Sequence, residues 1–269
     1  MADAIGLPAT YRHLVGARIR GQLQYRLSFG LYVVAQFLAA FADLLAVLVV
    51  FNRVPVLRGW SIEEVLYLYG TSQVAFTAAD LFLSQVDKCA VHIRQGTFDQ
   101  LLCRPLGPLF QLSTIEFELR RGGKVLQALL VMGIAAANLP VPWTAGRVVV
   151  TLTTIASAFV IFGGLWVITS SVAFWTVGST EVANAFTYGG GFLTQYPFDV
   201  FSSWLRRILL LVPVACVSYL PAAWVLDRPD AYDFPAWARL SSPAAAIATT
   251  LVARAVWRTA IRHYRSTGS

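Results

Sequence analysis

Charged residues are scarce in this sequence. Asp, Glu, Lys and Arg make up 13% of its 269 residues, against about 25% in a typical soluble domain. Hydrophobic residues make up 57%, and the mean hydropathy is +0.62. This composition excludes a disordered or fibrous chain and argues against a soluble globular enzyme. The three cysteines show no CxxC spacing and are too few for a disulfide framework.

Motifs of catalytic and metal chemistry are also missing. The sequence contains no GxxxxGK(S/T) loop for ATP phosphates, no HExxH zinc motif and no GxSxG nucleophile turn. Its three histidines do not cluster, and no carboxylate pair is placed for acid–base catalysis. We therefore expect no catalytic residue, cofactor or metal site in this chain. The net charge of +7 does not indicate nucleic acid, because basic residues in so apolar a chain sit at helix ends against anionic headgroups.

Long apolar runs are what the sequence has in abundance. A membrane-spanning helix needs about 20 mostly apolar residues. Five runs approach or meet this requirement, and the first and fourth meet it most clearly. These candidate spans are residues 28–51, 65–85, 122–139, 148–175 and 236–258.

Two broken apolar pieces lie between the fourth and the last of these candidates. Residues 182–196 are interrupted by three glycines, and residues 205–226 contain Pro213 and Pro221. Such pieces are typical of helices that re-enter the same side of the membrane or line a cavity. An ordinary kinked span is the alternative.

Basic residues orient the predicted bundle. Fourteen of the 21 Lys and Arg residues flank the spans on one side, which the positive-inside rule places in the cytoplasm. Both termini and the 87–120 loop then lie in the cytoplasm, so the number of crossings is even, and six fits best. In residues 1–27, an apolar residue recurs every four positions and predicts an amphipathic helix in the cytoplasmic interface. The repeat consists of Tyr11, Val15, Ile19, Leu23 and Leu27. A merely basic tail is the alternative.

Two acids interrupt the predicted spans. Asp43 lies near the middle of the first span, and Asp80 lies in the inner part of the second. A charge at this depth costs about 2.5–3.5 kcal/mol on insertion scales, so such a side chain faces the bundle or a cavity. Either acid could contact a cationic substrate or a proton. The alternative is a carboxyl group that is paired with a hydroxyl or an arginine, or that stays protonated.

The loop between the second and third spans contains the segment IRQGTFDQLLCRPL at residues 93–106. Gly96 interrupts a helical pattern, and Pro105 ends a short helix that begins near Asp99. Leu101 and Leu102 give that helix an apolar face. A short amphipathic helix between two spans suits docking into a groove on a partner protein, although the pattern alone also fits a surface helix.

This segment resembles the I-R-x-G-x-x-D-x-L-L-x-R-P-L motif of membrane subunits of type-2 ATP-binding-cassette exporters. More narrowly, it resembles the bacterial six-helix branch that works with a separate ATPase. Two further stretches are similar to that family. They are YPFDVF at 196–201, followed by WLR at 204–206 and YLPA at 219–222, and the ending HYRSTG at 263–268.

The resemblance implies an all-α integral membrane protein with six transmembrane helices. It adds an N-terminal amphipathic elbow helix, a cytoplasmic coupling helix at about 94–104 and an outer-side re-entrant hairpin. Charge counting alone would make 205–226 the fifth span, with Arg206 and Arg207 inside. The three glycines of 182–196 and the two prolines of 205–226 favour the hairpin. The implied regions are an elbow at 1–27, one transmembrane domain at 28–262 and a cytoplasmic tail at 263–269. Within the transmembrane domain, the resemblance implies a coupling loop at 87–120, a fifth span at 182–196 and a re-entrant segment at 198–226.

The implied function is that of an exporter permease in a bacterial cytoplasmic membrane. Two permeases, identical or sister chains, would pair, and two copies of a P-loop ATPase would bind ATP and Mg. The candidate coupling residues are Arg94, Gly96, Asp99, Leu102 and Arg104. The candidate pathway residues are Asp43, Asp80, Phe37, Phe41, Tyr67 and Phe76.

The two acids suit a small cationic or amphiphilic cargo such as a drug or natural product. The aromatic residues more often pack or face lipid. The main rival is a proton-coupled secondary transporter that uses Asp43 or Asp80. A lipid-modifying membrane enzyme and a structural subunit are further alternatives.

Overall fold

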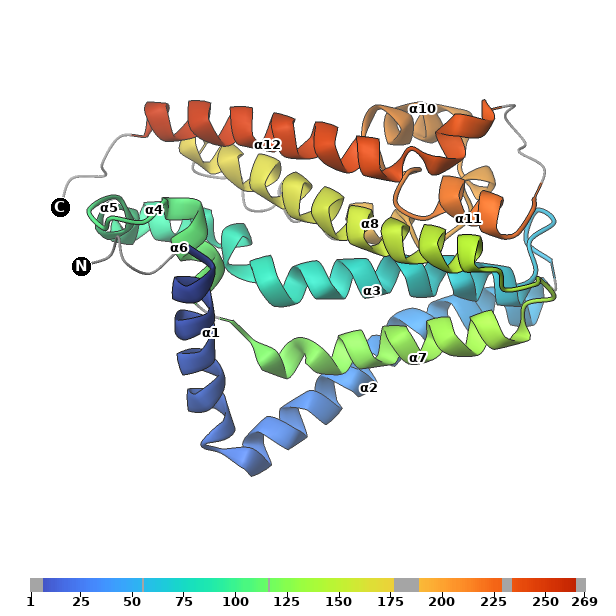
Figure 1. Ribbon diagram of the computed structural model, residues 1–269, viewed down its shortest axis with the longest axis horizontal. Helices are drawn as coiled ribbons and strands as arrows, with labels where there is room; N and C mark the ends of the chain where they lie inside the picture. The colour runs from blue at the N-terminus through green and yellow to red at the C-terminus, as the bar shows by residue number, and fades with distance from the viewer. Residues whose placement is uncertain (1–6, 55, 116, 177–188, 229–233, 265–269) are drawn as a thin grey trace.

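The computed structural model describes residues 7–54, 56–115, 117–176, 189–228 and 234–264 (Figure 1). Its long helices are α1 (Leu7–Leu23), α2 (Arg26–Arg53), α3 (Ile62–Asp87), α7 (Gly122–Asn138), α8 (Ala145–Ser171) and α12 (Ser242–His263). Its short helices are α4 (Cys89–Arg94), α5 (Thr97–Leu102), α6 (Pro108–Ile115), α10 (Ser203–Leu211) and α11 (Tyr219–Val225). Short 3-10 turns occur at Leu119–Arg121, Val172–Phe174, Phe198–Val200 and Ala236–Leu240. Over these ranges the chain forms no strand, only an isolated β-bridge between Leu57 and Trp60.

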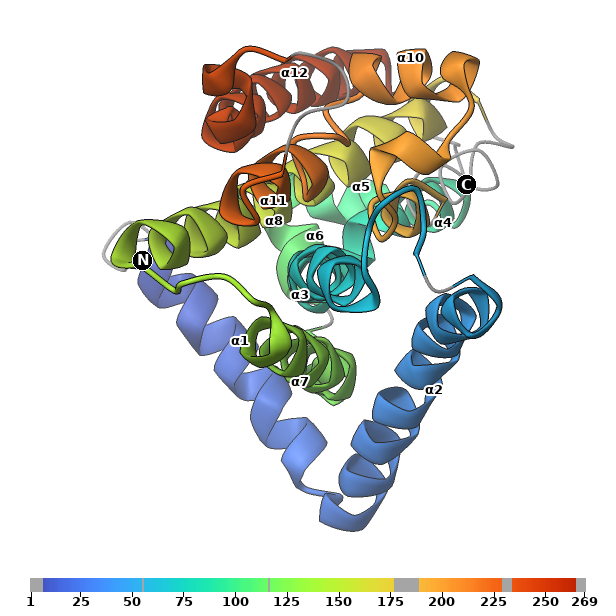
Figure 2. The same ribbon diagram turned by 90° about the vertical axis from the view of Figure 1, so that its right-hand side faces the viewer.

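Helix α3 is the centre of the bundle. It packs against α7 on one side and α8 on the other, while α12 covers α8 and α2 packs on α7 (Figures 1 and 2). The helices approach closely where a glycine on one helix faces a residue of its neighbour. A Cβ atom at Gly70 of α3 would lie 2.6 Å from the Cβ atom of Met132 on α7. Small residues at helix crossings are the usual device for packing helices in lipid, where apolar surroundings remove the hydrophobic driving force.

Large apolar side chains cover the outside of the long helices. Leu38 on α2, Leu152 on α8 and Leu251 on α12 are 61%, 60% and 62% exposed. Hydrocarbon solvates such a surface, whereas water does not. Among the described residues, three helices are long and apolar enough to cross a membrane, namely α2, residues 145–174 and α12.

The remaining predicted spans are less apolar, shorter or only partly described. Helices α3 and α7, both expected to cross the membrane, have 26 and 17 residues. Helix α12 begins at Ser242, because Ala236–Leu240 forms a separate 3-10 turn. The predicted fifth span at 182–196 lies partly outside the described residues, so six crossings stay a prediction.

The two ends of the bundle differ in what covers them. Helix α1 runs across one end instead of along the bundle, and α4, α5, α6 and the last turn of α12 lie at the same end (Figure 1). Helices α10 and α11 lie at the opposite end (Figure 1). The predicted elbow and coupling segments therefore share one end, and the predicted re-entrant segment lies at the other.

Helix α1 is held to this end through one face. Val15 is 8% exposed, and the Tyr11 ring lies 5.9 Å from the Phe110 ring of α6, edge to face. The Gln22 side-chain amide donates a hydrogen bond to the Phe117 carbonyl. The same face carries the four-residue repeat seen in the sequence, while Leu23, at its end, is 41% exposed.

Candidate coupling site at the α1 end

Two short helices, α4 and α5, meet at Gly96 and form a corner beyond the end of α3. Gly96 has φ +69°, a left-handed conformation that costs a residue with a Cβ about 1–2 kcal/mol. Across the corner, His92 Nδ1 lies 3.0 Å from the Thr97 hydroxyl oxygen. The glycine therefore lets the chain turn sharply enough for α5 to fold back on the bundle.

One face of α5 is buried against the ends of two long helices. Phe98 is fully buried, and Leu101 is 4% exposed. The Phe98 ring centroid lies 5.2 Å from that of Phe174 at the end of α8 and 5.0 Å from that of Tyr264 after α12. Both pairs are edge to face, an arrangement that stabilises aromatic contacts beyond the area they bury.

A hydrogen bond joins α5 to the end of α12. The Tyr264 hydroxyl donates to Asp99 Oδ1 at 2.8 Å. Burial and the neighbouring Asp99 carboxylate raise the pKa of the Tyr264 phenol to about 12, so the donor keeps its proton at physiological pH. Two segments of the family resemblance, Asp99 in the loop and Tyr264 in the ending, are thus bonded to each other.

Helix α6 closes the loop that follows α5. The Gln111 side-chain nitrogen donates to the Leu101 carbonyl at 2.7 Å and to the Leu106 carbonyl at 2.5 Å. Gln111 is 3% exposed, so both bonds are sheltered from water. The first bond satisfies one of the last carbonyl groups of α5, which a helix cannot pair internally, and the second ties the loop that follows α5 to α6.

The opposite face of α4 and α5 is open to solvent. Arg94, Leu102 and Arg104 are all exposed, and Leu102 shows 41% of its surface. The five predicted coupling residues therefore divide into two groups. Gly96 and Asp99 hold the corner in place, while Arg94, Leu102 and Arg104 form its exposed tip. Arginine beside an apolar side chain is a composition favoured at protein interfaces.

Asp80 is paired within the bundle. Its carboxylate forms an ion pair with the Arg121 guanidinium, and Arg121 Nε also contacts Glu118 Oε2 at 2.7 Å. Asp80 is 4% exposed. Among the alternatives considered for Asp80, the structure therefore shows a carboxyl group paired with an arginine.

Asp43 lies differently, on the exposed side of α2. Leu44, the next residue and about 100° further round the helix, is buried. Asp43 lies close enough to Tyr69 and Tyr196 to interact with both electrostatically. The structure does not bring Asp43 and Asp80 together as a pair of acids: Asp80 is buried beside Arg121, and Asp43 is exposed on α2.

The four candidate pathway aromatics lie in two places. The Phe37 and Phe41 rings contact each other on α2 with centroids 5.2 Å apart. Tyr67 and Phe76 lie in the contact of α3 with α8, where the Tyr67 hydroxyl is 2.7 Å from the Thr151 hydroxyl. Phe76 packs edge to face on Phe162, 5.2 Å between centroids. These contacts give Tyr67 and Phe76 a packing role.

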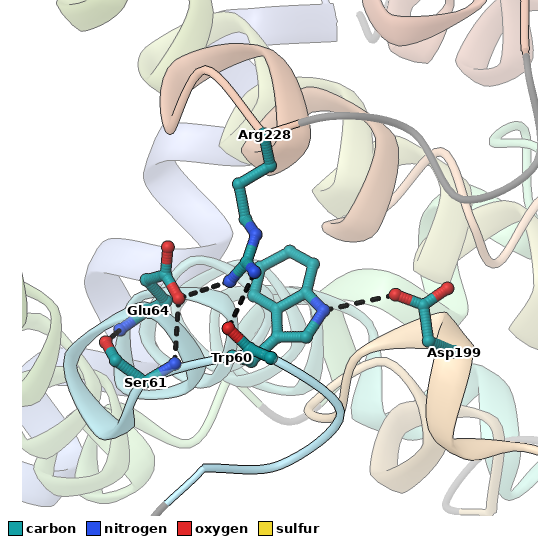
Figure 3. A network of polar contacts seen from close by, with 6 residues as sticks. Trp60, Ser61, Glu64, Asp199 and Arg228 are labelled. Atoms are coloured by element: carbon teal, nitrogen blue, oxygen red, sulfur yellow. Dashed lines mark hydrogen bonds and ion pairs between the residues drawn. The ribbon is translucent and has the colours of Figure 1, made fainter.

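A polar network at the opposite end was not anticipated from the sequence (Figure 3). The Arg228 guanidinium lies over the Trp60 ring at 4.4 Å, pairs with Glu64 and donates to the Gly59 carbonyl at 2.6 Å. The Trp60 indole donates to Asp199 Oδ2 at 3.1 Å. Asp199 belongs to the YPFDVF stretch, and the family resemblance of that stretch was the one sequence feature that pointed to this region. The network fastens the start of α3 to the segments around α10 and α11.

Within the described ranges, no group of three or more His, Cys, Asp or Glu side chains is placed to hold a metal ion. The coupling corner, the Asp80–Arg121 pair and the Arg228 network are instead contacts between helices. The fold and its apolar exterior define a multi-pass α-helical membrane protein.

Comparison with known families names the class more closely. Residues 37–268 match the family described as ABC-2 family transporter protein. The match covers most of the chain, and the protein belongs to this family. It is the membrane subunit of a type-2 ATP-binding-cassette transporter, as the three sequence segments predicted. Neither a curated protein nor a solved structure gives a significant match.

Proposed function

We propose that this chain is the permease of an ATP-driven exporter and that the exposed tip of α4 and α5 contacts the ATPase. The observation that carries this is the two-sided corner: Arg94, Leu102 and Arg104 are exposed, while Phe98 is fully buried against the ends of α8 and α12. Two copies of a P-loop ATPase bind ATP and Mg. The chain lies in a bacterial cytoplasmic membrane, with α1, the corner and both termini in the cytoplasm.

The corner can pass a movement of the ATPase to the membrane helices. A partner shifts a conformational equilibrium only by as much as its contacts differ between the two states. The base of α5 touches the ends of α8 and α12 through Phe98 and through the Asp99–Tyr264 bond. A displacement of the tip therefore acts directly on two long helices, without a flexible linker between them.

Asp43 supports pairing with a second permease, identical or a sister chain. An exposed carboxylate in the middle of a spanning helix is unfavourable in lipid, by about 2.5–3.5 kcal/mol on insertion scales. A second subunit, or a water-filled path between two subunits, removes that cost. An acid on such a path suits a small cationic or amphiphilic cargo, such as a drug or natural product.

The proton-coupled alternative is less well supported. A proton-binding acid has to exchange its proton during transport, and Asp80 is held by the Arg121 guanidinium. Asp43 is the remaining candidate for that role. A transporter of this kind needs no ATPase and stops when the proton gradient is collapsed.

Capture of the partner tests the proposal. The tagged chain is isolated from native membranes in mild detergent, and co-purifying proteins are identified by mass spectrometry. We expect a stoichiometric P-loop ATPase with the wild type and a loss of at least tenfold with Arg94→Gln/Arg104→Gln. The matched control is Arg53→Gln, which removes an exposed arginine at the far end of α2. A chain that stays functional without an ATPase, or equal loss in the control, would contradict the proposal.

A further inference from the structure

A cavity of about 590 Å³ lies where α1 meets α2, beside the segment that leads into α7. Arg18, Gly21 and Gln22 line it from α1, while Tyr25 and Phe29 line it from the turn and the start of α2. Helix α1 runs across the end of the bundle (Figure 1), and the cavity is lined by the end of α1 and the start of α2, which is the beginning of a predicted span. It is separate from the α4–α5 corner.

Cationic groups in this cavity are left without anionic partners. Arg18 and Arg120 both line it, and neither forms an ion pair with another residue in the described ranges. The Arg120 guanidinium lies 4.7 Å from the centre of the Tyr32 ring, and its Nε atom is buried without a hydrogen-bond acceptor. The carboxylate at the cavity, Glu118, is bound to Arg121 at 2.7 Å. Within the part of the chain that the structure describes, the cavity therefore has two arginine side chains without an ion-pair partner and one unsatisfied N–H donor, which an anion would pair with.

The walls of the cavity are equally informative. Besides the two arginines, Tyr25, Phe29 and Phe117 supply aromatic surface. The helix that rises from the cavity exposes apolar side chains, with Leu31 at 63% and Leu38 at 61%. A ligand that fits both features carries an anionic group at one end and hydrocarbon at the other.

We propose that this cavity binds the phosphate of a membrane phospholipid, with the acyl chains lying along the exposed face of α2. Guanidinium groups bind phosphate through charge-assisted, often bidentate hydrogen bonds, and anionic headgroups attract basic residues near the membrane surface. A lipid held there bridges α1, α2 and the start of α7. It would set the angle of the elbow helix, a property distinct from contact with an ATPase.

Binding of a short-chain lipid tests this assignment. The purified full chain in non-ionic detergent is titrated with dioctanoyl-phosphatidylglycerol by calorimetry. We expect saturable binding, and a Kd raised at least tenfold in Arg18→Gln/Arg120→Gln. The matched control is Arg12→Gln, an exposed arginine on the same helix outside the cavity lining. Its Kd should stay within twofold of the wild type.

A second variant fills the cavity without changing charge. A Cβ atom at Gly21 would meet nothing within 4 Å, so Gly21→Phe places a ring in the open space. Because glycine has a lower helix propensity than phenylalanine, this substitution is not expected to weaken α1. Its Kd should rise by a similar factor, while circular dichroism stays unchanged.

Three results would overturn the assignment. Inorganic phosphate that competes with the lipid at equal concentration would make this a site for soluble phosphate. Equal weakening by Arg12→Gln would reduce the effect to general charge. Saturable binding that survives both cavity variants would place the lipid elsewhere. None of these outcomes depends on whether an ATPase partner is found.

Discussion

The Tyr264 hydroxyl offers the most specific test of how the corner is held. Tyr264→Phe removes one oxygen and keeps the ring that packs against Phe98 and Phe174. The change leaves Asp99 without the donor now 2.8 Å from its Oδ1 atom. A hydrogen bond to a charged group contributes about 1.5–3 kcal/mol. Since both side chains are only half-buried, we expect a value around or just below the lower limit of that range, about 1–2 kcal/mol.

Hydrogen exchange of the α5 amides measures this loss directly. If α5 opens locally, a loss of about 1–2 kcal/mol speeds exchange roughly 5- to 30-fold in Thr97–Leu102. Exchange in the middle of α3 and α8 should not change. The control is Tyr25→Phe, whose ring is 71% exposed and which should leave α5 unaffected.

A double-mutant cycle shows whether the bond itself is responsible. Tyr264→Phe, Asp99→Ala and the double variant are compared in the same exchange experiment. Partners in one bond give non-additive effects, whereas independent sites add within about 0.3–0.5 kcal/mol. Strict additivity, or an α5 exchange rate unchanged by Tyr264→Phe, would refute the role assigned to this contact.

Three further predictions concern the corner and the two ion-pair sites. Gly96→Ala should destabilise α5 by about 1–2 kcal/mol, because φ is +69° there, and faster α5 exchange would show it. Asp80→Ala should lower the free energy of unfolding by about 3 kcal/mol by leaving the Arg121 guanidinium without this partner; an unchanged melting temperature would contradict the pair. Arg228→Gln should cost about 1 kcal/mol, because Glu64 and Trp60 lose a partly exposed cation, and thermal unfolding in detergent measures it.

Alkaline pH should loosen the corner in a predictable window. The pKa of Tyr264 is raised to about 12, against about 10 in an unfolded chain. The neutral phenol is therefore favoured in the folded state. Its contribution is fully present below pH 10 and is lost as pH rises toward 12. Because hydroxide catalyses amide exchange in every protein, the α5 exchange rates of the wild type and Tyr264→Phe are compared with each other at each pH. The ratio of the two rates should fall toward one as pH rises toward 12; a ratio that does not change with pH would assign the loosening to another group.

Hydropathy and local signals predicted several helices of this protein. The apolar runs predict α2, α8 and α12, because a helix in lipid must pair its own backbone groups and expose apolar side chains. Gly96 and Pro105 predict a broken helix in the loop, since a left-handed turn and a proline act on their immediate neighbours. The family motif in the same loop predicts membership in the transporter family, which the match over 37–268 confirms.

The partners of the polar side chains were decided only by the tertiary structure. Asp80 and Arg121 are 41 positions apart, Trp60 and Asp199 are 139 apart, and Asp99 and Tyr264 are 165 apart. Helical periodicity relates residues three and four positions apart and carries no information on such distances. Whether an acid in a span is paired or exposed depends on which helix packs beside it. The sequence by itself therefore determined a helical membrane protein of this family with a broken helix in its loop. The packing of the helices decided that Asp99 holds the loop to the end of α12, that Asp80 is paired and that Asp43 is exposed.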